Sequence, residues 1–167
     1  MKIELAKENK LPVIYEMYEA CKAAMRASQN FQWTDTYPNF NIVEQDIKSG
    51  HLYVLSDGKS VLGSIVVNTD QDPQYDKIKW EETIGPFLII HRLAVHPAHQ
   101  KKGLAKKLME FAENFALINQ YKSIRLDAYT ANVAASRLYI ERMYKERGQL
   151  YFRNLAIPFC CYEKQVI

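Results

Sequence analysis

The stretch FLIIHRLAVHPAHQKKGLAKKLMEFAENFA, from Phe87 to Ala116, decides the fold. Its first part, Phe87–Val95, is almost continuously apolar and rich in branched side chains, which is typical of a strand buried on both faces of a sheet. Pro97 ends this strand. Apolar residues then recur at helical spacing and predict an amphipathic helix packed against the strand; they are Leu104, Leu108, Phe111, Ala112 and Phe115.

The turn between this strand and this helix has the features of an anion-binding loop. A helix N-terminus exposes unpaired N–H groups and the positive end of the helix dipole, so it attracts an anion wherever the backbone is accessible. Gly103 and the small Ala105 allow that close approach. The alternative is an ordinary strand–turn–helix in which Gly103 only serves the turn.

Length and charge limit the classes of protein. With 167 residues, of which 48% are hydrophobic, we expect one domain that spans residues 1–167. The net charge of +3 comes without a dense basic arm, which argues against a nucleic-acid partner. The densest basic group lies at the proposed anion loop, although a solvated helix face would also explain part of it; it comprises Lys101, Lys102, Lys106 and Lys107.

The sequence also bears on location and on metals. The N-terminus lacks the apolar segment of a signal peptide, and no run of eighteen apolar residues occurs, so a cytoplasmic protein without a membrane partner is expected. Cys21, Cys160 and Cys161 form no metal-type pair, and their odd number argues against a disulfide framework. The histidines have no matching carboxylate or thiolate set, so no metal is expected.

Upstream of the central stretch, the pattern predicts a strand at Met1–Ala6 and a helix that Asn9 caps. The buried face of that helix comprises Ile14, Met17, Tyr18, Cys21 and Met25. A short helix, Ile42–Lys48, begins after Asn41 and is ended by Gly50. Asp57-Gly58 then predicts a hairpin of strands Leu52–Leu55 and Ser60–Val67, and the polar loop Asn68–Glu82 is interpreted as a flap over an acceptor site.

Downstream, Ile124, Leu126 and Ala128 alternate with Arg125, Asp127 and Tyr129, which predicts a strand. Asn132 then caps a helix on which Ala135, Leu138 and Tyr139 share a face. Gly148 is expected to end this region. A closing antiparallel pair is expected from Leu150–Phe152 and Phe159–Lys164.

Two segments resemble the GNAT superfamily of N-acetyltransferases. Gln-x-x-Gly-x-Ala at Gln100–Ala105, between its strand and helix, resembles that family's acetyl-CoA signature, and Asn132, Ala135 and Tyr139 fit its pattern Asn-x-x-Ala-x-x-x-Tyr. The resemblance implies an α/β (α+β) GNAT fold, with a mixed, mostly antiparallel central sheet, flanking helices and splayed central strands. One departure is Met143-Tyr144, where the family commonly has Gly-Phe.

The same resemblance implies the cofactor residues and the reaction. Acetyl-CoA is the implied co-substrate, with direct transfer of the acetyl group to an amine, because no cysteine lies in either motif. The implied cofactor contacts are Leu93, Ala94, Val95, Gln100, Lys101, Lys102, Gly103, Leu104, Ala105, Asn132 and Ser136. Tyr139 is the implied acid for the departing thiolate, with a purely structural core tyrosine as the alternative.

His91 is the candidate general base. On a regular strand it shares a face with Leu93 and Val95, and a histidine pKa of roughly 6.5 suits proton removal from an ammonium group near neutrality. A core histidine remains the alternative, as do water relays from Glu81 or Glu82.

The acceptor is the least determined feature of the sequence. Trp33, Asp35 and Tyr37 lie in an aromatic-rich loop and are predicted to bind an ammonium group, although such aromatics also cover core edges. We therefore expect as partner a small-molecule amine or a peptide amino group; a homodimer is left open. The alternative function is a GNAT-like domain that binds acyl-CoA as a sensor or scaffold without turnover.

Overall fold

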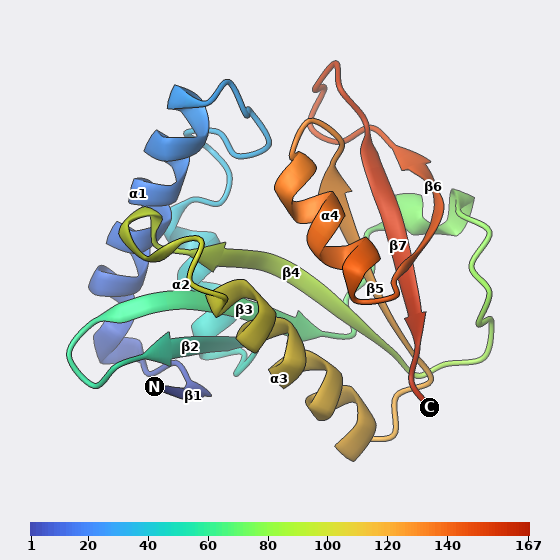
Figure 1. Ribbon diagram of the computed structural model, residues 1–167, viewed down its shortest axis with the longest axis horizontal. Helices are drawn as coiled ribbons and strands as arrows, with labels where there is room; N and C mark the ends of the chain where they lie inside the picture. Colours follow the sequence, from blue (N-terminus) through green and yellow to red (C-terminus); the bar gives the residue numbers. More distant parts are fainter. The chain divides into compact units, whose positions relative to one another are not determined.

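A computed structural model describes all residues, 1–167, as a mixed α/β fold (Figure 1). Its seven strands follow the order β1-β2-β3-β4-β5-β7-β6 in one sheet. β4 and β5 run parallel, whereas the pairs β1–β2, β2–β3, β5–β7 and β6–β7 are antiparallel. The expected mixed, mostly antiparallel sheet is therefore confirmed.

The strands are β1 (Lys2–Leu5), β2 (Leu52–Ser56), β3 (Val61–Asn68), β4 (Phe87–Val95), β5 (Ser123–Tyr129), β6 (Lys145–Leu150) and β7 (Phe159–Gln165). The helices are α1 (Leu11–Ala27), α2 (Phe40–Lys48), α3 (Leu104–Ile118) and α4 (Val133–Glu141), with short 3-10 helices at Glu8–Lys10, Pro73–Lys77 and Pro97–His99. None of the helices combines the length and the apolarity that crossing a membrane requires. The chain divides into two compact units, Met1–Val67 with Arg92–Phe111 and Asn68–His91 with Ala112–Ile167.

In the first unit, α1 packs its apolar face into a core with residues of α2, β2 and β3. The predicted face is confirmed at Ile14, Met17, Tyr18 and Cys21, whereas Met25 is only half-buried. Two predicted caps are wrong: α1 begins after Lys10 without a side-chain cap, and α2 is capped by Asn39 rather than Asn41, because the Asn39 side chain accepts from the Ile42 amide at 3.0 Å.

Gly63 of β3 lies against the end of β4. A Cβ atom at this position would meet the carbonyl oxygen of Ala94 at 2.7 Å and a methyl group of Leu108 at 3.2 Å. Real Cβ atoms do not approach backbone oxygen that closely, because close-packed interiors leave no room for overlap. Only glycine therefore lets β3, β4 and the first turns of α3 pack as they do.

In the second unit, β5, β7 and β6 lie side by side with α4 next to them (Figure 1). The hydrophobic core of this unit includes Tyr75, Ile89, Tyr129 and Cys161. The predicted end at Gly148 is wrong, since Gly148 lies inside β6 at a shift of register with β7. The predicted strand Leu150–Phe152 is likewise too late in the chain, because β6 already ends at Leu150.

Pairing between β4 and β5 is short. It covers three residue pairs and ends at Ile89 opposite Arg125, although both strands continue for several residues. Parallel strands that stop pairing leave backbone N–H and C=O groups available for other partners. This is the expected splay of the central strands.

Candidate active site

The loop before α3 has the geometry expected of an anion-binding loop. Gly103 adopts φ +75°, and no atom would lie within 4 Å of a Cβ added there. Lys101 is also left-handed, with φ 60°. The Gln100 side chain folds back and donates to the Val95 carbonyl at 3.1 Å, which fixes the start of the loop against the end of β4. The first amides of α3, from Leu104 and Ala105, have no partner within the helix, and the backbone at Gly103 is open to approach.

The lysines of this loop are exposed. Lys102 donates to the Ala98 carbonyl at 3.3 Å, so its ammonium group stays next to the loop backbone. A cationic, glycine-containing loop at a helix N-terminus fits a phosphate group. Of the preceding strand residues, Ala94 is buried against β3, while Leu93 and Val95 are half-buried.

β4 contains a bulge at Arg92. Its φ of 47° is left-handed, so the regular alternation of side chains is interrupted between His91 and Leu93. The expectation that His91 shares a face with Leu93 and Val95 is therefore wrong, because the strand is not regular at Arg92. The Arg92 carbonyl accepts from the Tyr18 hydroxyl at 3.3 Å.

The predicted acceptor loop lies in the first unit and is already partly occupied by internal contacts. Trp33 packs on the Tyr18 ring at 5.3 Å between centroids. Tyr37 accepts from the Arg92 guanidinium at 3.0 Å, while the same guanidinium binds both oxygens of Asp46. The exposed Asp35 pairs with Arg26 at 2.5 Å.

The second unit contains the other predicted residues. Asn132 caps α4 by accepting from the Ala135 amide at 3.2 Å, and Ser136 lies in the following turn. Tyr139 is buried on α4, with its ring 5.6 Å from that of Tyr162 and 6.0 Å from that of Tyr144. The expected glycine position after this helix is taken by Met143, which adopts φ 67° and so forms the turn without glycine.

Burial gives Tyr139 a protonated phenol. Burial raises its pKa well above the ordinary value of 10.0, and the negative charge of Asp127 raises it further. The phenol therefore holds its proton at physiological pH, which is the state that a proton donor needs.

His91 is oriented by Asn68. Its Nε2 lies 3.0 Å from the Asn68 Oδ1 atom, so Nε2 donates to the amide oxygen and, in the neutral ring, the lone pair is on Nδ1. A neutral imidazole held in one tautomer is suited to accept a proton.

Asp127 is a polar residue for which the sequence pattern predicted a place in a strand but no functional role. It is the only residue of β5 that is not buried, and its Oδ2 accepts from the Tyr75 hydroxyl at 2.7 Å. The available signal was an acidic residue in an otherwise apolar alternation. Its partner Tyr75 is far away in sequence, so no local pattern pointed to the pair.

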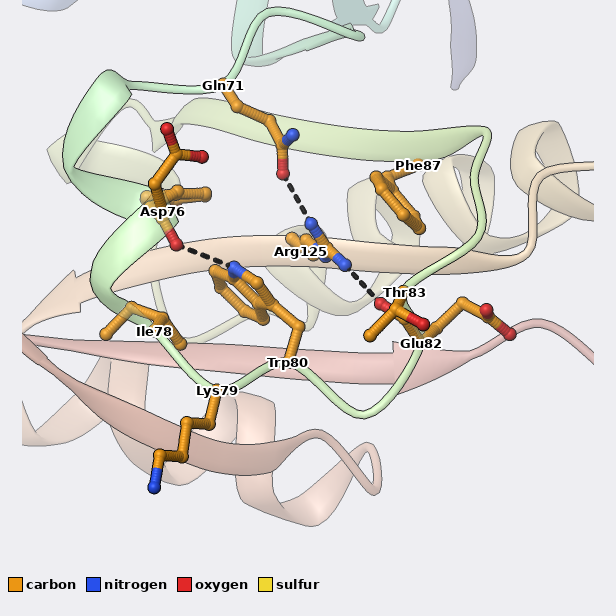
Figure 2. A pocket seen from close by; sticks show the side chains of 10 residues that line it. Gln71, Asp76, Ile78, Lys79, Trp80, Glu82, Thr83, Phe87 and Arg125 are labelled. Carbon is orange, nitrogen blue, oxygen red and sulfur yellow. Dashed lines mark hydrogen bonds between the residues drawn. The ribbon is translucent and has the colours of Figure 1, made fainter.

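The segment Asn68–Pro86, which we call the strap, covers this part of the second unit and lines an open pocket of about 500 Å³ together with Phe87 and Arg125 (Figure 2). Arg125 lies at its centre. Its guanidinium carbon is 3.6 Å from the centroid of the Phe87 ring and 4.4 Å from the centroid of the Trp80 ring. The guanidinium donates to Gln71 Oε1 at 2.6 Å and to the Glu82 carbonyl at 2.5 Å. Arg125 therefore holds the strap at two separate points.

Cys21, Cys160 and Cys161 are all free thiols and buried. Nowhere do three or more His, Cys, Asp or Glu side chains gather in a cluster that could hold a metal ion.

Comparison with known proteins connects this geometry to a family. The sequence pattern of the Acetyltransferase (GNAT) family matches residues 12–144. Streptothricin acetyltransferase of Escherichia coli is 40% identical over 63 residues, which cover 38% of this chain and 36% of that protein. The chain thus matches little more than a third of that relative's length.

Two solved structures share the fold across nearly the full chain. A GNAT-family acetyltransferase from Streptococcus agalactiae 2603 has a TM-score of 0.80 and 25% identity, over 98% of this chain and 94% of that one. The structure of yncA from Salmonella typhimurium, solved with its cofactor acetyl-CoA, has a TM-score of 0.73 and 18% identity. The match covers 100% of this chain and 94% of that one.

Proposed function

Since the chain belongs to the acetyltransferase (GNAT) family, we propose that it is an acetyl-CoA-dependent N-acetyltransferase that acts as one domain over residues 1–167. The acceptor is a primary amine of a small molecule or an exposed peptide amino group, and the transfer is direct. The likeness to an E. coli streptothricin acetyltransferase and to yncA with its acetyl-CoA supports this proposal.

The observation that carries the proposal is the open, left-handed Gly103 in front of α3. The amides of Gly103, Leu104 and Ala105 would hold the pyrophosphate, with charge from Lys101 and Lys102. When bound, acetyl-CoA supplies an acetyl thioester, whose carbonyl carbon bonds to the amine nitrogen while the carbon–sulfur bond breaks. The remaining proposed cofactor contacts are Leu93, Ala94, Val95, Gln100, Asn132 and Ser136.

The amine must lose a proton before it attacks, and the departing thiolate must gain one. His91 would take the first proton at Nδ1, since its Nε2 already donates to Asn68. Tyr139 would supply the second, because burial keeps its phenol protonated. The two roles need a neutral imidazole at His91 and a protonated phenol at Tyr139.

The aromatic loop would contribute to acceptor binding. Trp33 and Tyr37 offer ring faces to an ammonium group, and Asp35 offers a carboxylate that now pairs with Arg26. An incoming ammonium group would therefore compete with Arg26 for Asp35.

Release of CoA thiol, followed with a thiol reagent, tests the proposed function. Wild-type protein with acetyl-CoA should release thiol in the presence of at least one amine from a panel of lysine, spermidine, streptothricin and a peptide with a free N-terminus. Mass spectrometry should then find the acetylated amine. Tight acetyl-CoA binding without thiol release from any amine would instead favour the non-catalytic sensor or scaffold.

A further inference from the structure

The register of β4 and β5 brings two polar residues to the same level. Ile89 of β4 pairs with Arg125 of β5, and the strands are parallel. Neighbours in a parallel register point their side chains to the same face, and the pattern repeats every second residue. Two residues further along, His91 is therefore level with Asp127, just beyond the last paired residues.

Packing confirms that this is one face of the sheet. The Arg125 guanidinium lies over the Phe87 ring, while Ile89 and Tyr129 share the core cluster beneath the strap. His91 follows Ile89 in the alternation, and the bulge at Arg92 comes only after His91. The strap side of the sheet thus carries both polar side chains.

The Asp127 carboxylate is oriented by a buried tyrosine of the strap. Tyr75, which is only 2% exposed, donates its hydroxyl to Asp127 Oδ2. Burial and the charge of Asp127 raise the pKa of Tyr75 well above its ordinary value, so the phenol remains a donor. Tyr75 is in turn fixed by the strap, since its carbonyl accepts from the Trp80 indole at 2.9 Å and the two rings lie 5.1 Å apart.

We propose that Asp127 binds the protonated amino group of the acetyl acceptor next to His91, and that Tyr75 is the positioning residue that orients the Asp127 carboxylate. This inference rests on the proposed function and deepens it, because it defines the acceptor as an aliphatic primary amine that is charged at neutral pH. An ionised carboxylate at a half-buried position selects a cation over a neutral amine.

The proton balance follows from this arrangement. The ammonium group on Asp127 gives one proton to the neutral ring of His91 and becomes the nucleophilic amine. Its nitrogen then bonds to the thioester carbonyl carbon, the carbon–sulfur bond breaks, and the leaving thiolate takes a proton from the proposed donor Tyr139. The second proton of the acylated nitrogen goes to the Tyr139 phenolate, and the His91 imidazolium releases its proton to solvent. Asp127 stays ionised throughout and stabilises the imidazolium that has formed beside it.

The test compares Asp127→Asn with the wild type, using lysine and spermidine as charged amines. Asparagine keeps the size of the side chain and an oxygen that accepts from Tyr75 but removes the charge. We expect the amine KM to rise about tenfold or more, the order expected when a charged hydrogen bond is lost, while acetyl-CoA affinity from calorimetry stays within about twofold.

Three further variants serve as controls. Asp76→Asn removes an exposed carboxylate from the same strap and should leave the amine KM unchanged. Asp127→Glu keeps the charge and should recover part of the amine affinity. Tyr75→Phe keeps the carboxylate but loses its orienting bond, so its amine KM should lie between those of the wild type and Asp127→Asn.

The outcomes separate the inference from the function on which it rests. Wild-type turnover together with an unchanged amine KM in folded Asp127→Asn would overturn the role of Asp127 and leave the enzyme activity standing. If Asp127→Asn does not fold, an amine KM of Tyr75→Phe equal to that of the wild type would overturn the orienting role on which the proposal depends. Absence of wild-type turnover with every amine would remove both proposals together.

Discussion

The Arg125 guanidinium lies 3.3 Å from the Glu163 carboxylate, with side-chain exposures of 4% and 0%. Glu163 also accepts from the Ser123 hydroxyl at 3.0 Å and from the Glu81 amide of the strap at 2.7 Å. The buried ion pair therefore joins β5, β7 and the strap into one hydrogen-bonded group.

Glu163→Gln should destabilise the protein strongly, because it leaves the Arg125 charge buried without its counterion. Removal of one partner from a buried ion pair costs about 3–5 kcal/mol, which urea unfolding would measure. Glu141→Gln, which breaks an exposed pair with Arg137, should cost under about 1 kcal/mol. Equal losses in the two variants would contradict the structural importance of the buried pair.

Gly103→Asp should weaken acetyl-CoA binding. The substitution adds a side chain and a repelling charge where the pyrophosphate is proposed to bind, and we expect an affinity loss of about tenfold or more by calorimetry. Gly50→Asp is the matched control, since Gly50 has φ +71° and equally open surroundings. Both variants carry similar backbone strain of about 1 kcal/mol, so only the binding result should differ.

Tyr139→Phe should lower turnover by about a hundredfold with little change in acetyl-CoA affinity, since it deletes one proton donor and keeps the ring packing. Tyr144→Phe makes the same chemical change in a buried neighbour whose ring lies 6.0 Å away, and it should keep wild-type turnover. Normal single-turnover rates in Tyr139→Phe would assign the residue a structural role only.

His91→Ala should change how the rate depends on pH. Below neutrality a protonated imidazole cannot accept a proton, so the wild-type rate should fall on the acidic side of the profile. In the variant this acidic limb should flatten or move, with a lower plateau. An acidic limb that keeps its position would mean that another group acts as the base.

Glu113 should make stability fall in acid. Its burial favours the neutral form, yet bonds from Arg142 at 2.8 Å and Lys164 at 3.1 Å hold its pKa below the ordinary value of 4.5. Folding therefore favours the ionised carboxylate, whose contribution is complete above pH 4.5 and is lost as the pH falls through the folded-state pKa. The difference in unfolding free energy between wild type and Glu113→Gln, measured by urea unfolding, should shrink on acidification.

Local patterns predicted those elements that depend on neighbours in sequence. The strand Phe87–Val95 has the predicted bounds, and the hairpin about Asp57-Gly58 forms from β2 and β3 as expected. Local patterns did not predict the cap of α2. Asn39 and Asn41 are both favourable residues at a helix start, and only the backbone conformation decides between them.

The features that the sequence did not predict depend on distant residues. Tyr75 and Asp127 are 52 positions apart, and Arg125 and Glu163 are 38 apart, so neither pair leaves a periodic signal. The bulge at Arg92 is similarly hidden, because an arginine with positive φ is held there by its contacts rather than by its own preference. Gly148 was predicted to end its region, yet pairing with the distant strand β7 keeps it within β6.

The lack of room for a side chain between Gly63 and the Ala94 carbonyl limits which substitutions this chain can accept during evolution. Position 63 takes no part in the proposed chemistry, yet replacement by the smallest chiral residue would push β3 away from the end of β4, where the loop proposed to bind acetyl-CoA begins. At the exposed Gly58 nothing lies within 4 Å of the missing side chain, so a substitution there meets only the backbone strain of its φ of +93°. Recombination that exchanged β3 for the same strand of a relative would therefore succeed only where the donor also carries glycine at that position.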